Sequence, residues 1–413
     1  MVRINSDRLK ANLEEVNTFG LNKATQGINR VGFGEDDFNA RRWLMAKMEE
    51  IGLKTWMDSV GNVFGRLGPK EGECIMSGSH LDSVPEGGKY DGVLGVMSAL
   101  ESVQAIQEAN IDLKYAIEIV AFAEEEGRFG GMLGSQALSG QVDPEWLENS
   151  KDVDGIKLSD AMATQNLNYK DALTSGRSDI KHFVEIHIEQ GPVLEKSNIP
   201  IGIVDSISGT SNPLFTIVGE ANHSGTTPMH LRKDASRALF DIGAQIPQLI
   251  SQHGSSEARL TIGKCTFFPN FPHTVPGKVE FSVNIRDTDG AKMDSLDAAF
   301  SQKAQEVCEK GGFTLEIDRS LGRLEPVILD SDLKSVLVEE AEKLVGAGDY
   351  IVMPSGAGHD AQQMQKVAKS GMIFIPSQNG VSHSPEEFTD HKYVAQGTQL
   401  LCNTLRRLAE GAS

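Results

Sequence analysis

The amino-acid sequence predicts an α/β protein in which a mostly parallel sheet is interrupted by a smaller, inserted α+β domain. Three observations support this fold class. Helical and strand-like patterns alternate over residues 1–208, a separate βαββαβ order occupies residues 209–326, and the α/β alternation resumes over residues 327–413. The chain of 413 residues also exceeds the roughly 250 to 300 residues at which a single core stops growing, so we expect two domains.

The first segment alternates helices with buried strands. Apolar residues recur at helical spacing over residues 36–53 and 91–107, whereas residues 74–84 and 115–123 have the pattern of strands that run into loops. Because strands separated by helices are joined by crossovers, we expect them to be parallel. Loops at the carboxyl ends of parallel strands bind ligands, so chemistry is expected there.

The inserted segment, residues 209–326, has a pattern of its own. Its expected order is strand, helix, two strands, helix and strand, at residues 213–225, 234–254, 258–268, 278–289, 291–312 and 313–321. Such a βαββαβ unit folds as a small ferredoxin-like sheet with both helices on one face. The larger domain is therefore discontinuous, and its second part should contain helices at residues 333–346 and 392–401 and a strand at residues 371–377.

The composition excludes several classes of partner. The chain has 58 Asp and Glu against 39 Lys and Arg, and its formal charge of −19 repels nucleic-acid phosphates and anionic membranes. No apolar stretch approaches the ~20 residues of a membrane span. The four cysteines lie far apart without a CxxC pair, so neither a disulfide framework nor a thiolate zinc site is indicated. We therefore expect a cytoplasmic protein that binds neither nucleic acid nor membrane.

The strand at residues 115–123 ends on three consecutive acids, Glu124, Glu125 and Glu126. Like charges packed together raise one another's pKa and destabilise the fold unless a cation or solvent compensates them. An acidic run is most often a water-exposed loop, and a metal site is the alternative. The remaining chemistry-bearing residues decide between the two interpretations.

Three histidines also follow predicted strands. His80 lies with Asp82 and Asp91 in a glycine-rich loop. His187 lies near the end of an alternating strand, on one face with acids, and His383 lies in a loop of small residues after a later strand. Each histidine alone is more often an ordinary loop residue. Together, imidazoles and carboxylates at one edge of a sheet suit zinc, manganese or cobalt, so the sequence predicts a metal site.

Seven motifs follow one another between residues 77 and 387: GSHLDSVPEGGKYDG, FAEEEG, HIEQGPVLE, HSGTTPM, PNFPHTVPG, SGAGHDA and GVSHSPEE. In content and order they resemble the dinuclear metal amidohydrolases. That family includes N-carbamoyl-L-amino-acid hydrolases, allantoate amidohydrolases and β-alanine synthases, and it is related to the aminoacylase-like metallopeptidases. The number and order of the motifs make the resemblance specific.

The resemblance implies two divalent metal ions per subunit. These would be zinc, or alternatively manganese, cobalt or nickel. It assigns the ligands as His80, Asp91 and His187 for one ion and Asp91, Glu126 and His383 for the other. Asp91 would bridge ions that lie roughly 3.5 to 4 Å apart and share a water whose pKa they lower. Asp82 would fix the tautomer and orientation of the His80 ring.

The resemblance also implies that one acid stays free as a general base. Counting from the strand end makes Glu125 the base and Glu126 the ligand, with Glu124 structural or solvated. Many family members have one more residue before the Arg-Phe pair that begins here at Arg128. Alignment on that pair would make Glu124 the base and Glu125 the ligand. We prefer the first alignment because it preserves the distance from the strand.

The inserted domain would supply groups that contact the substrate. By the resemblance, His223 polarises the scissile carbonyl and stabilises the oxyanion, while Asn270 and Arg286 hold the substrate. Arg286 would act as a fork for its carboxylate, and a salt bridge to Asp287 or Asp289 is the structural alternative. Two further residues fall within matching motifs and are expected to contact substrate: Gln190 and Gly358. His359 and Asp360, which follow Gly358, would form a turn.

The expected reaction is metal-dependent hydrolysis of a linear amide C–N bond. The first choice of substrate is the ureido group of an N-carbamoyl-L-amino acid, which would give the L-amino acid, carbon dioxide and ammonia. Allantoate, other ureido acids and N-acyl amino acids are alternatives because the motifs are shared. A binding or scaffold protein without catalysis would require a broken ligand set or base, and neither is visible. The resemblance also implies a homodimer built through the inserted domain, which would act as a lid.

Overall fold

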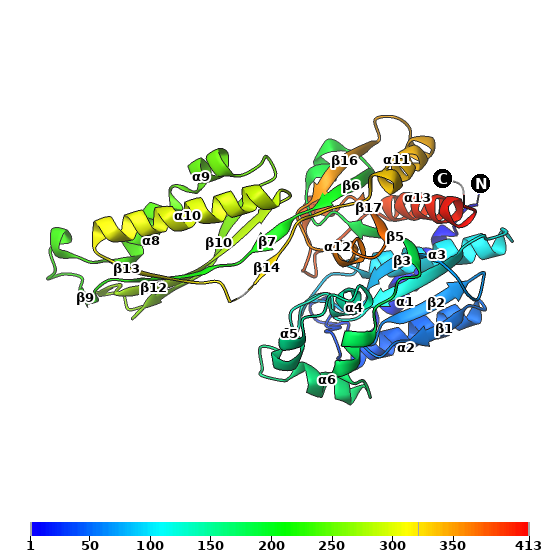
Figure 1. Cartoon of the computed structure of the whole chain (residues 1–413), viewed down its shortest axis with the longest axis horizontal. Helices are drawn as coiled ribbons and strands as arrows, with labels where there is room; N and C mark the ends of the chain where they lie inside the picture. Colours follow the sequence, from blue (N-terminus) through cyan, green and yellow to red (C-terminus); the bar gives the residue numbers. More distant parts are fainter. Residues whose placement is uncertain (1, 321, 412–413) are drawn as a thin grey trace. The chain divides into compact units, whose positions relative to one another are not determined.

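The computed structural model describes residues 2–320 and 322–411, which form two compact units (Figure 1). The larger unit comprises the described residues of Met1–Asp205, Leu329–Met353 and His359–Ser413. The smaller unit comprises the described residues of Ser206–Ile328 and Pro354–Gly358. The larger unit is thus discontinuous in the sequence. The strand predicted over residues 313–321 ends at Leu321, which lies outside the described residues.

A mixed sheet forms the centre of the larger unit, with strands in the order β1-β2-β4-β3-β5-β17-β6 and with β16 paired to β6. The bounds are β1 (Lys54–Met57), β2 (Val63–Leu67), β3 (Cys74–His80), β4 (Ala116–Phe122), β5 (Ile180–Ile188), β6 (Ile201–Ile207), β16 (Tyr350–Ser355) and β17 (Lys369–Ile375). The four central strands, β4, β3, β5 and β17, are parallel, as predicted. Strands β3 and β4 are buried along their whole length, which explains their continuous apolar character.

Four longer helices pack on this sheet: α2 (Glu35–Glu50), α3 (Val93–Glu108), α11 (Ser331–Val345) and α13 (His391–Ala409). A fifth, α1 (Ser6–Val16), packs on α3 and α13. Helix α3 is mostly apolar, and 13 of its 16 residues are buried. It packs against strands β3, β4 and β5 and against helix α13. A helix covered in this way needs no polar face, and it fixes the loop that precedes it.

Short helices fill the segment between β4 and β5: α4 (Leu133–Leu138), α5 (Pro144–Asn149), α6 (Leu158–Thr164) and η1 (Tyr169–Thr174). They surround a second apolar cluster that includes Ala123, Phe129 and Leu147. Ala123 and Phe129 flank the acidic segment, so this cluster anchors both of its ends. The remaining short helices of the larger unit are α7 (Val193–Ser197), α12 (Asp360–Met364) and η3 (Gln378–Gly380).

A six-stranded antiparallel sheet forms the smaller unit, in the order β13-β8-β12-β7-β14 with β10 paired to β12. The bounds are β7 (Gly209–Ser211), β8 (Leu214–Val218), β10 (Arg259–Phe268), β12 (Lys278–Asp287), β13 (Thr314–Asp318) and β14 (Arg323–Leu324). Strand β9 (Asn222–His223) pairs with β11 (Thr274–Val275), and β15 (Val327–Ile328) pairs with the end of β6. A 3-10 turn, η2 (Met229–Leu231), completes the unit.

Helices α8 (Ala235–Gly243), α9 (Ile246–His253) and α10 (Gly290–Gly311) complete this unit. The core forms where α8 and α10 meet alternate buried residues of β12, namely Val279, Phe281, Val283 and Ile285. The prediction of one helix over residues 234–254 is wrong at its centre. Pro247 lies in the first turn of α9, and because proline cannot continue a helix from the preceding turn, two helices form.

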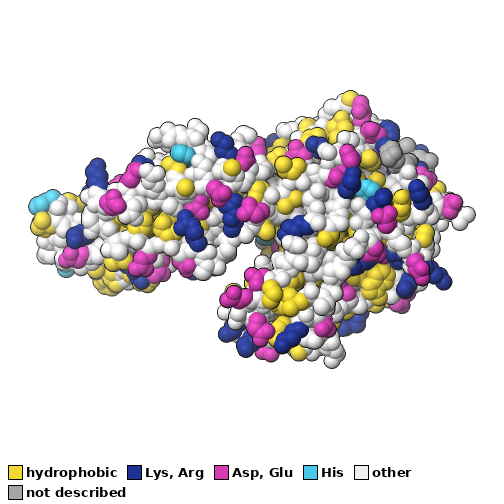
Figure 2. Space-filling model, viewed as in Figure 1, with side chains coloured by type: hydrophobic (Ala, Val, Ile, Leu, Met, Phe, Trp, Pro, Cys, Tyr) yellow, Lys and Arg dark blue, Asp and Glu magenta, His cyan; other side chains and the backbone are white. Residues whose placement is uncertain are grey.

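Among the described residues, no helix combines the length and the hydropathy that crossing a bilayer requires. On the face drawn in Figure 2, acidic and basic side chains are interspersed over both units.

Candidate metal centre

The predicted ligands lie at the carboxyl ends of the central parallel strands. His80 is the last residue of β3, and His187 is the penultimate residue of β5. The acidic segment begins two residues after β4, and His383 follows β17 and η3. Because these four strands are parallel neighbours, their carboxyl ends meet at one edge of the sheet. The topology therefore brings together segments that are up to three hundred residues apart.

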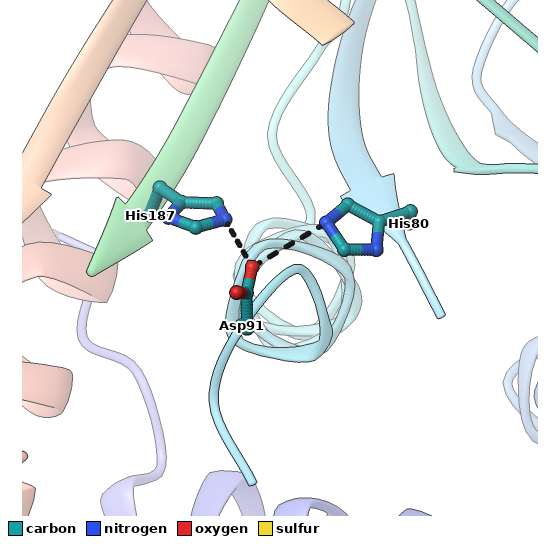
Figure 3. A group of neighbouring side chains, drawn as sticks. All are labelled: His80, Asp91 and His187. Carbon is teal, nitrogen blue, oxygen red and sulfur yellow. Dashed lines mark ion pairs between the residues drawn. The ribbon is translucent and has the colours of Figure 1, made fainter. Parts of the chain in front are cut away.

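Asp91, His80 and His187 form a buried group (Figure 3). One candidate ligand atom from each lies within 4.8 Å of the others. The Asp91 Oδ1 atom lies 3.6 Å from Nε2 of His80 and 3.0 Å from Nε2 of His187. Figure 3 shows both rings directed at the carboxylate, which reaches them from the loop before α3.

The second carboxylate oxygen of Asp91 belongs to another group, with Glu126 and His383. His383 Nε2 lies 3.1 Å from Asp91 Oδ2 and 3.4 Å from Glu126 Oε2. Asp91 is therefore shared, with one oxygen toward each group. The five residues that the sequence predicted as ligands are all brought together, in the two groups that the resemblance implied.

Backbone carbonyls orient both buried imidazoles. His80 Nδ1 lies 3.0 Å from the carbonyl oxygen of Asp82, and His187 Nδ1 lies 2.8 Å from that of Ile188. An N–H at Nδ1 would donate to these carbonyls and leave Nε2 of each ring as the free ligand atom. The carboxylate of Asp82, expected to orient His80, instead accepts hydrogen bonds from the backbone N–H groups of Glu125 (3.3 Å) and Glu126 (3.0 Å). Asp82 thus holds the acidic segment as well as His80.

The acidic run is not a solvated loop. The side chains of Glu125 and Glu126 are only 10% and 9% exposed, and Glu124 is fully buried. Glu125 Oε2 lies 3.5 Å from Nε2 of His80. Burial, together with the neighbouring acids, raises the pKa of Glu126 to about 7 and holds the pKa of Glu125 well above its usual range. Repulsion of this kind calls for a cation in the site.

Asp91 differs from the other acids of the site. Burial raises its pKa, but hydrogen bonds with His187, His383 and His80 outweigh burial and hold the pKa well below its usual value. Unlike the three glutamates, Asp91 therefore favours its anionic form, which the surrounding imidazoles stabilise. The donor set of imidazole nitrogens and carboxylate oxygens fits divalent transition ions such as zinc, manganese or cobalt.

Glu124 has a structural position. Its carboxylate accepts hydrogen bonds from the backbone N–H groups of Phe129 (2.6 Å) and Gly131 (3.3 Å), and burial raises its pKa to about 8. It closes the loop that follows it. The geometry thus supports the alignment in which Glu125 is the free acid and Glu126 the ligand, because only Glu126 joins the group with His383.

Several buried residues around the site were not predicted. Arg41 is fully buried, pairs with Asp37 at 2.8 Å and donates to the carbonyls of Ala121 and Phe122 at the end of β4. Glu185 accepts hydrogen bonds from the Ser79 hydroxyl (2.7 Å) and the Ala361 N–H (2.9 Å). Apart from the Arg41–Asp37 pair within α2, these bonds join residues far apart in the sequence, so no local pattern reveals them. The only sequence signal was that Glu185 shares a strand face with His187.

Gln190 and the segment after Gly358 also adjoin the ligands. Gln190 Nε2 lies 2.7 Å from Asp91 Oδ2 and 3.1 Å from the Ser382 hydroxyl. His359 and Asp360, expected only to form a turn, are buried, and the His359 ring centroid lies 4.6 Å from that of His187. Gly358 itself belongs to the short 354–358 segment of the smaller unit.

The predicted substrate residues of the smaller unit are accessible. His223 is exposed, and its Nδ1 accepts hydrogen bonds from the backbone N–H groups of Gly225 (3.0 Å) and Thr226 (3.2 Å). Its Nε2 is therefore left as an N–H donor. Asn270 is exposed and adopts a left-handed conformation with φ of 57°.

Arg286 has no acidic partner among the described residues. It lies on β12 and donates to the carbonyl of Gly356 (2.7 Å) and to Asn284 Oδ1 (3.1 Å). The alternative of a salt bridge is wrong for both candidate acids. Asp287 accepts hydrogen bonds from Ser255, and Asp289 caps the N-terminus of α10. The guanidinium has five N–H groups, of which these two hydrogen bonds use only some.

Comparison with known proteins identifies the family of the chain. The model of Peptidase family M20/M25/M40 matches residues 76–407. An N-carbamoyl-L-amino-acid amidohydrolase of Pseudomonas sp. (strain NS671) is 36% identical, over 98% of each chain, and an allantoate amidohydrolase of Bacillus subtilis (strain 168) is 37% identical, over 94% of each. The crystal structure of a hydantoinase/carbamoylase family amidase from Burkholderia multivorans superimposes with a TM-score of 0.91, at 28% identity and 99% coverage of both chains. The resemblance found in the motifs is confirmed: the chain belongs to the M20/M25/M40 peptidase family and is a hydrolase of the amidohydrolase type.

Proposed function

We propose that this chain hydrolyses the ureido C–N bond of N-carbamoyl-L-amino acids, giving the L-amino acid, carbon dioxide and ammonia. The observation that carries the proposal is the pair of ligand groups that share Asp91, next to an acid, Glu125, that belongs to neither group. The amidohydrolase relatives support the reaction class. The substrate is proposed from the same relatives.

The proposed ligands are His80, Asp91 and His187 for one divalent ion and Asp91, Glu126 and His383 for a second. When bound, such ions supply Lewis acidity that polarises a carbonyl and lowers the pKa of water at the site. Asp82 and the backbone carbonyls beside the imidazoles would keep the ligand atoms oriented.

Glu125 is the proposed general base and acid. As the base, its carboxylate removes a proton from the attacking water, whose oxygen forms a bond to the carbamoyl carbon. It then donates that proton to the substituted nitrogen as the C–N bond breaks and the amino acid leaves. The remaining carbamate decomposes to carbon dioxide and ammonia. Glu125 suits this role because it is buried and lies within 3.5 Å of an imidazole ligand.

His223 and Arg286 are the proposed substrate contacts of the smaller unit. The Nε2–H of His223 would donate a hydrogen bond to the oxyanion that forms at the carbamoyl oxygen. Arg286 would bind the α-carboxylate through N–H groups that Gly356 and Asn284 leave free. Three further residues are proposed to contact the substrate: Gln190, Asn270 and Gly358.

Allantoate hydrolysis is the second candidate, because an allantoate amidohydrolase is 37% identical to this chain. Incubating metal-loaded protein with N-carbamoyl-L-methionine or with allantoate, and measuring ammonia, separates the two. We expect ammonia and free methionine from the first substrate. Ammonia from allantoate alone would replace the first proposal by the second.

A homodimer is also proposed, as the sequence resemblance implied. Light scattering of the purified protein coupled to size exclusion would give twice the 44.7 kDa chain mass if the proposal is correct. A mass of one chain would refute it.

A further inference from the structure

A single buried carboxylate joins the segment that carries Asp91 to the segment that carries His383. It belongs to Glu387, whose exposure is 3%. Its Oε1 accepts hydrogen bonds from the backbone N–H groups of Tyr90 (2.8 Å) and Asp91 (3.1 Å). Its Oε2 accepts a hydrogen bond from the Ser382 hydroxyl at 2.7 Å. The Glu387 side chain therefore holds both the backbone of Asp91 and the Ser382 hydroxyl, which is adjacent in sequence to His383.

The packing around Glu387 leaves it little freedom. A Cβ atom added to Gly88 would lie 2.1 Å from the Glu387 carboxyl carbon, so the glycine-rich turn runs directly over the carboxylate. The rings of Tyr90 and Phe388 form an edge-to-face contact with centroids 6.2 Å apart. The two segments are thus joined by polar bonds and by ring packing.

Ser382 extends the connection to the shared ligand. Its hydroxyl lies 2.7 Å from Glu387 Oε2 and 3.1 Å from Asp91 Oδ2, the oxygen that faces His383. Glu387 uses both of its oxygens in these bonds and stands outside both ligand groups. Glu387 thus contacts the residues that carry or adjoin the proposed ligands.

We propose that Glu387 is a positioning residue that sets the spacing between Asp91 and His383, and with it the metal affinity of the Asp91–Glu126–His383 group. The inference rests on the proposed metal-dependent function. Groups that orient metal ligands typically change metal affinity or activity by about 10- to 100-fold when they are removed. We expect an effect of that size for Glu387→Ala.

The test is a Co²⁺ titration of the metal-free protein, followed by visible absorption and by elemental analysis. Three variants are compared: E387A, E387Q and E386A. E387A should bind the second ion about 10- to 100-fold more weakly, with an altered Co²⁺ spectrum. E387Q should stay close to the unmodified protein, because an amide oxygen still accepts from the two backbone N–H groups and the amide nitrogen can donate to the Ser382 oxygen. E386A, at the exposed neighbouring position, should change nothing.

Gly88→Ala provides an independent variant that leaves Glu387 in place. The added methyl group would displace the carboxylate, so it should reproduce the loss seen in E387A. If E387A does not fold, G88A and E387Q decide the question. Second-ion affinity and a spectrum equal to those of the unmodified protein in E387A, or in a folded G88A, would overturn the proposal. Normal binding of two ions without hydrolysis of any ureido substrate would refute the proposed function alone.

Discussion

The two units of the molecule differ in where they keep their charged groups. The larger unit carries 27 Lys and Arg against 44 Asp and Glu, whereas the smaller unit is nearly balanced, with 12 against 14. Acids of the larger unit are buried around the ligands, and burial raises the pKa of Glu124, Glu125 and Glu126. The proposed substrate residues of the smaller unit are exposed or half-buried. The proposed cation site thus consists of buried, crowded carboxylates, and the proposed substrate contacts of the smaller unit are accessible donors.

The largest effect is expected when the proposed shared ligand, Asp91, is removed. Asp91→Ala should abolish binding of both ions, whereas His383→Ala should leave the group with His80 and His187 able to bind one. Metal content after dialysis, measured by elemental analysis, checks both expectations. Equal loss in the two variants would show that the groups are not separate sites. Hydrolysis should fall below detection in D91A.

The next effect concerns the base. Glu125→Gln should lower kcat by about 10²- to 10⁴-fold, because an amide cannot move the proton. Its metal content should stay unchanged, since Glu125 lies outside both ligand groups. Steady-state ammonia release and elemental analysis are the measurements, with the exposed E71Q as a matched control. Normal turnover by a metal-loaded E125Q would refute the mechanism.

A residue of the smaller unit should behave differently from a ligand. His223→Ala should lower kcat by about 10²- to 10³-fold, because one donor to the oxyanion is lost. Metal affinity should not change, and this separates the roles of the two units. H230A, at another exposed histidine of the same unit, is the control. A parallel loss of bound metal in H223A would contradict the division of roles.

The smallest effect is on stability. In the larger unit, burial raises the pKa of Asp58 from 3.8 to about 6, so the folded state binds this proton more tightly than the unfolded state. Stability from Asp58 is therefore greatest at low pH and falls as pH rises from about 4 to about 6, by about 3 kcal/mol at most. Thermal midpoints should consequently fall less between pH 4 and pH 7 in D58N, as calorimetry would show.

Asp318 of the smaller unit gives the matched control of opposite sign. Hydrogen bonds from Ser320 lower its pKa, so its contribution is present at neutral pH and is lost as pH falls through its folded pKa. D318N should reduce the loss of stability in acid instead. If both substitutions changed the pH dependence of the thermal midpoint in the same direction, the opposite pKa shifts of Asp58 and Asp318 would be contradicted.

The proposed ligands could be singled out in the sequence because they lie at, or in the loops after, the carboxyl ends of predicted strands. The strands at residues 74–84, 115–123 and 371–377 have strong apolar patterns, and parallel topology then requires their ends to meet. The helices between β4 and β5 escaped prediction, because elements of six or seven residues are too short to show a helical period. The break in the helix over residues 234–254 was signalled by Pro247, which marks a new first turn.

The residues that support the ligands could not be predicted from the sequence. Glu185, Glu387 and Arg41 each make at least one hydrogen bond to a backbone group or hydroxyl that lies from 80 to nearly 300 residues away. Such bonds depend on the complete fold and leave no spacing in the chain. Glu124 shows the same limit, because its loop-closing bonds to the following backbone were not separable in the sequence from solvent exposure.

The divided carboxylate of Asp91 has a consequence for how the molecule can change. Each of its oxygens belongs to a different cluster, so neither cluster can be rebuilt for another ion without disturbing its neighbour. Occupation of one cluster should therefore alter the metal affinity of the other. An engineer who wished to exchange a single ion would have to redesign both halves at once.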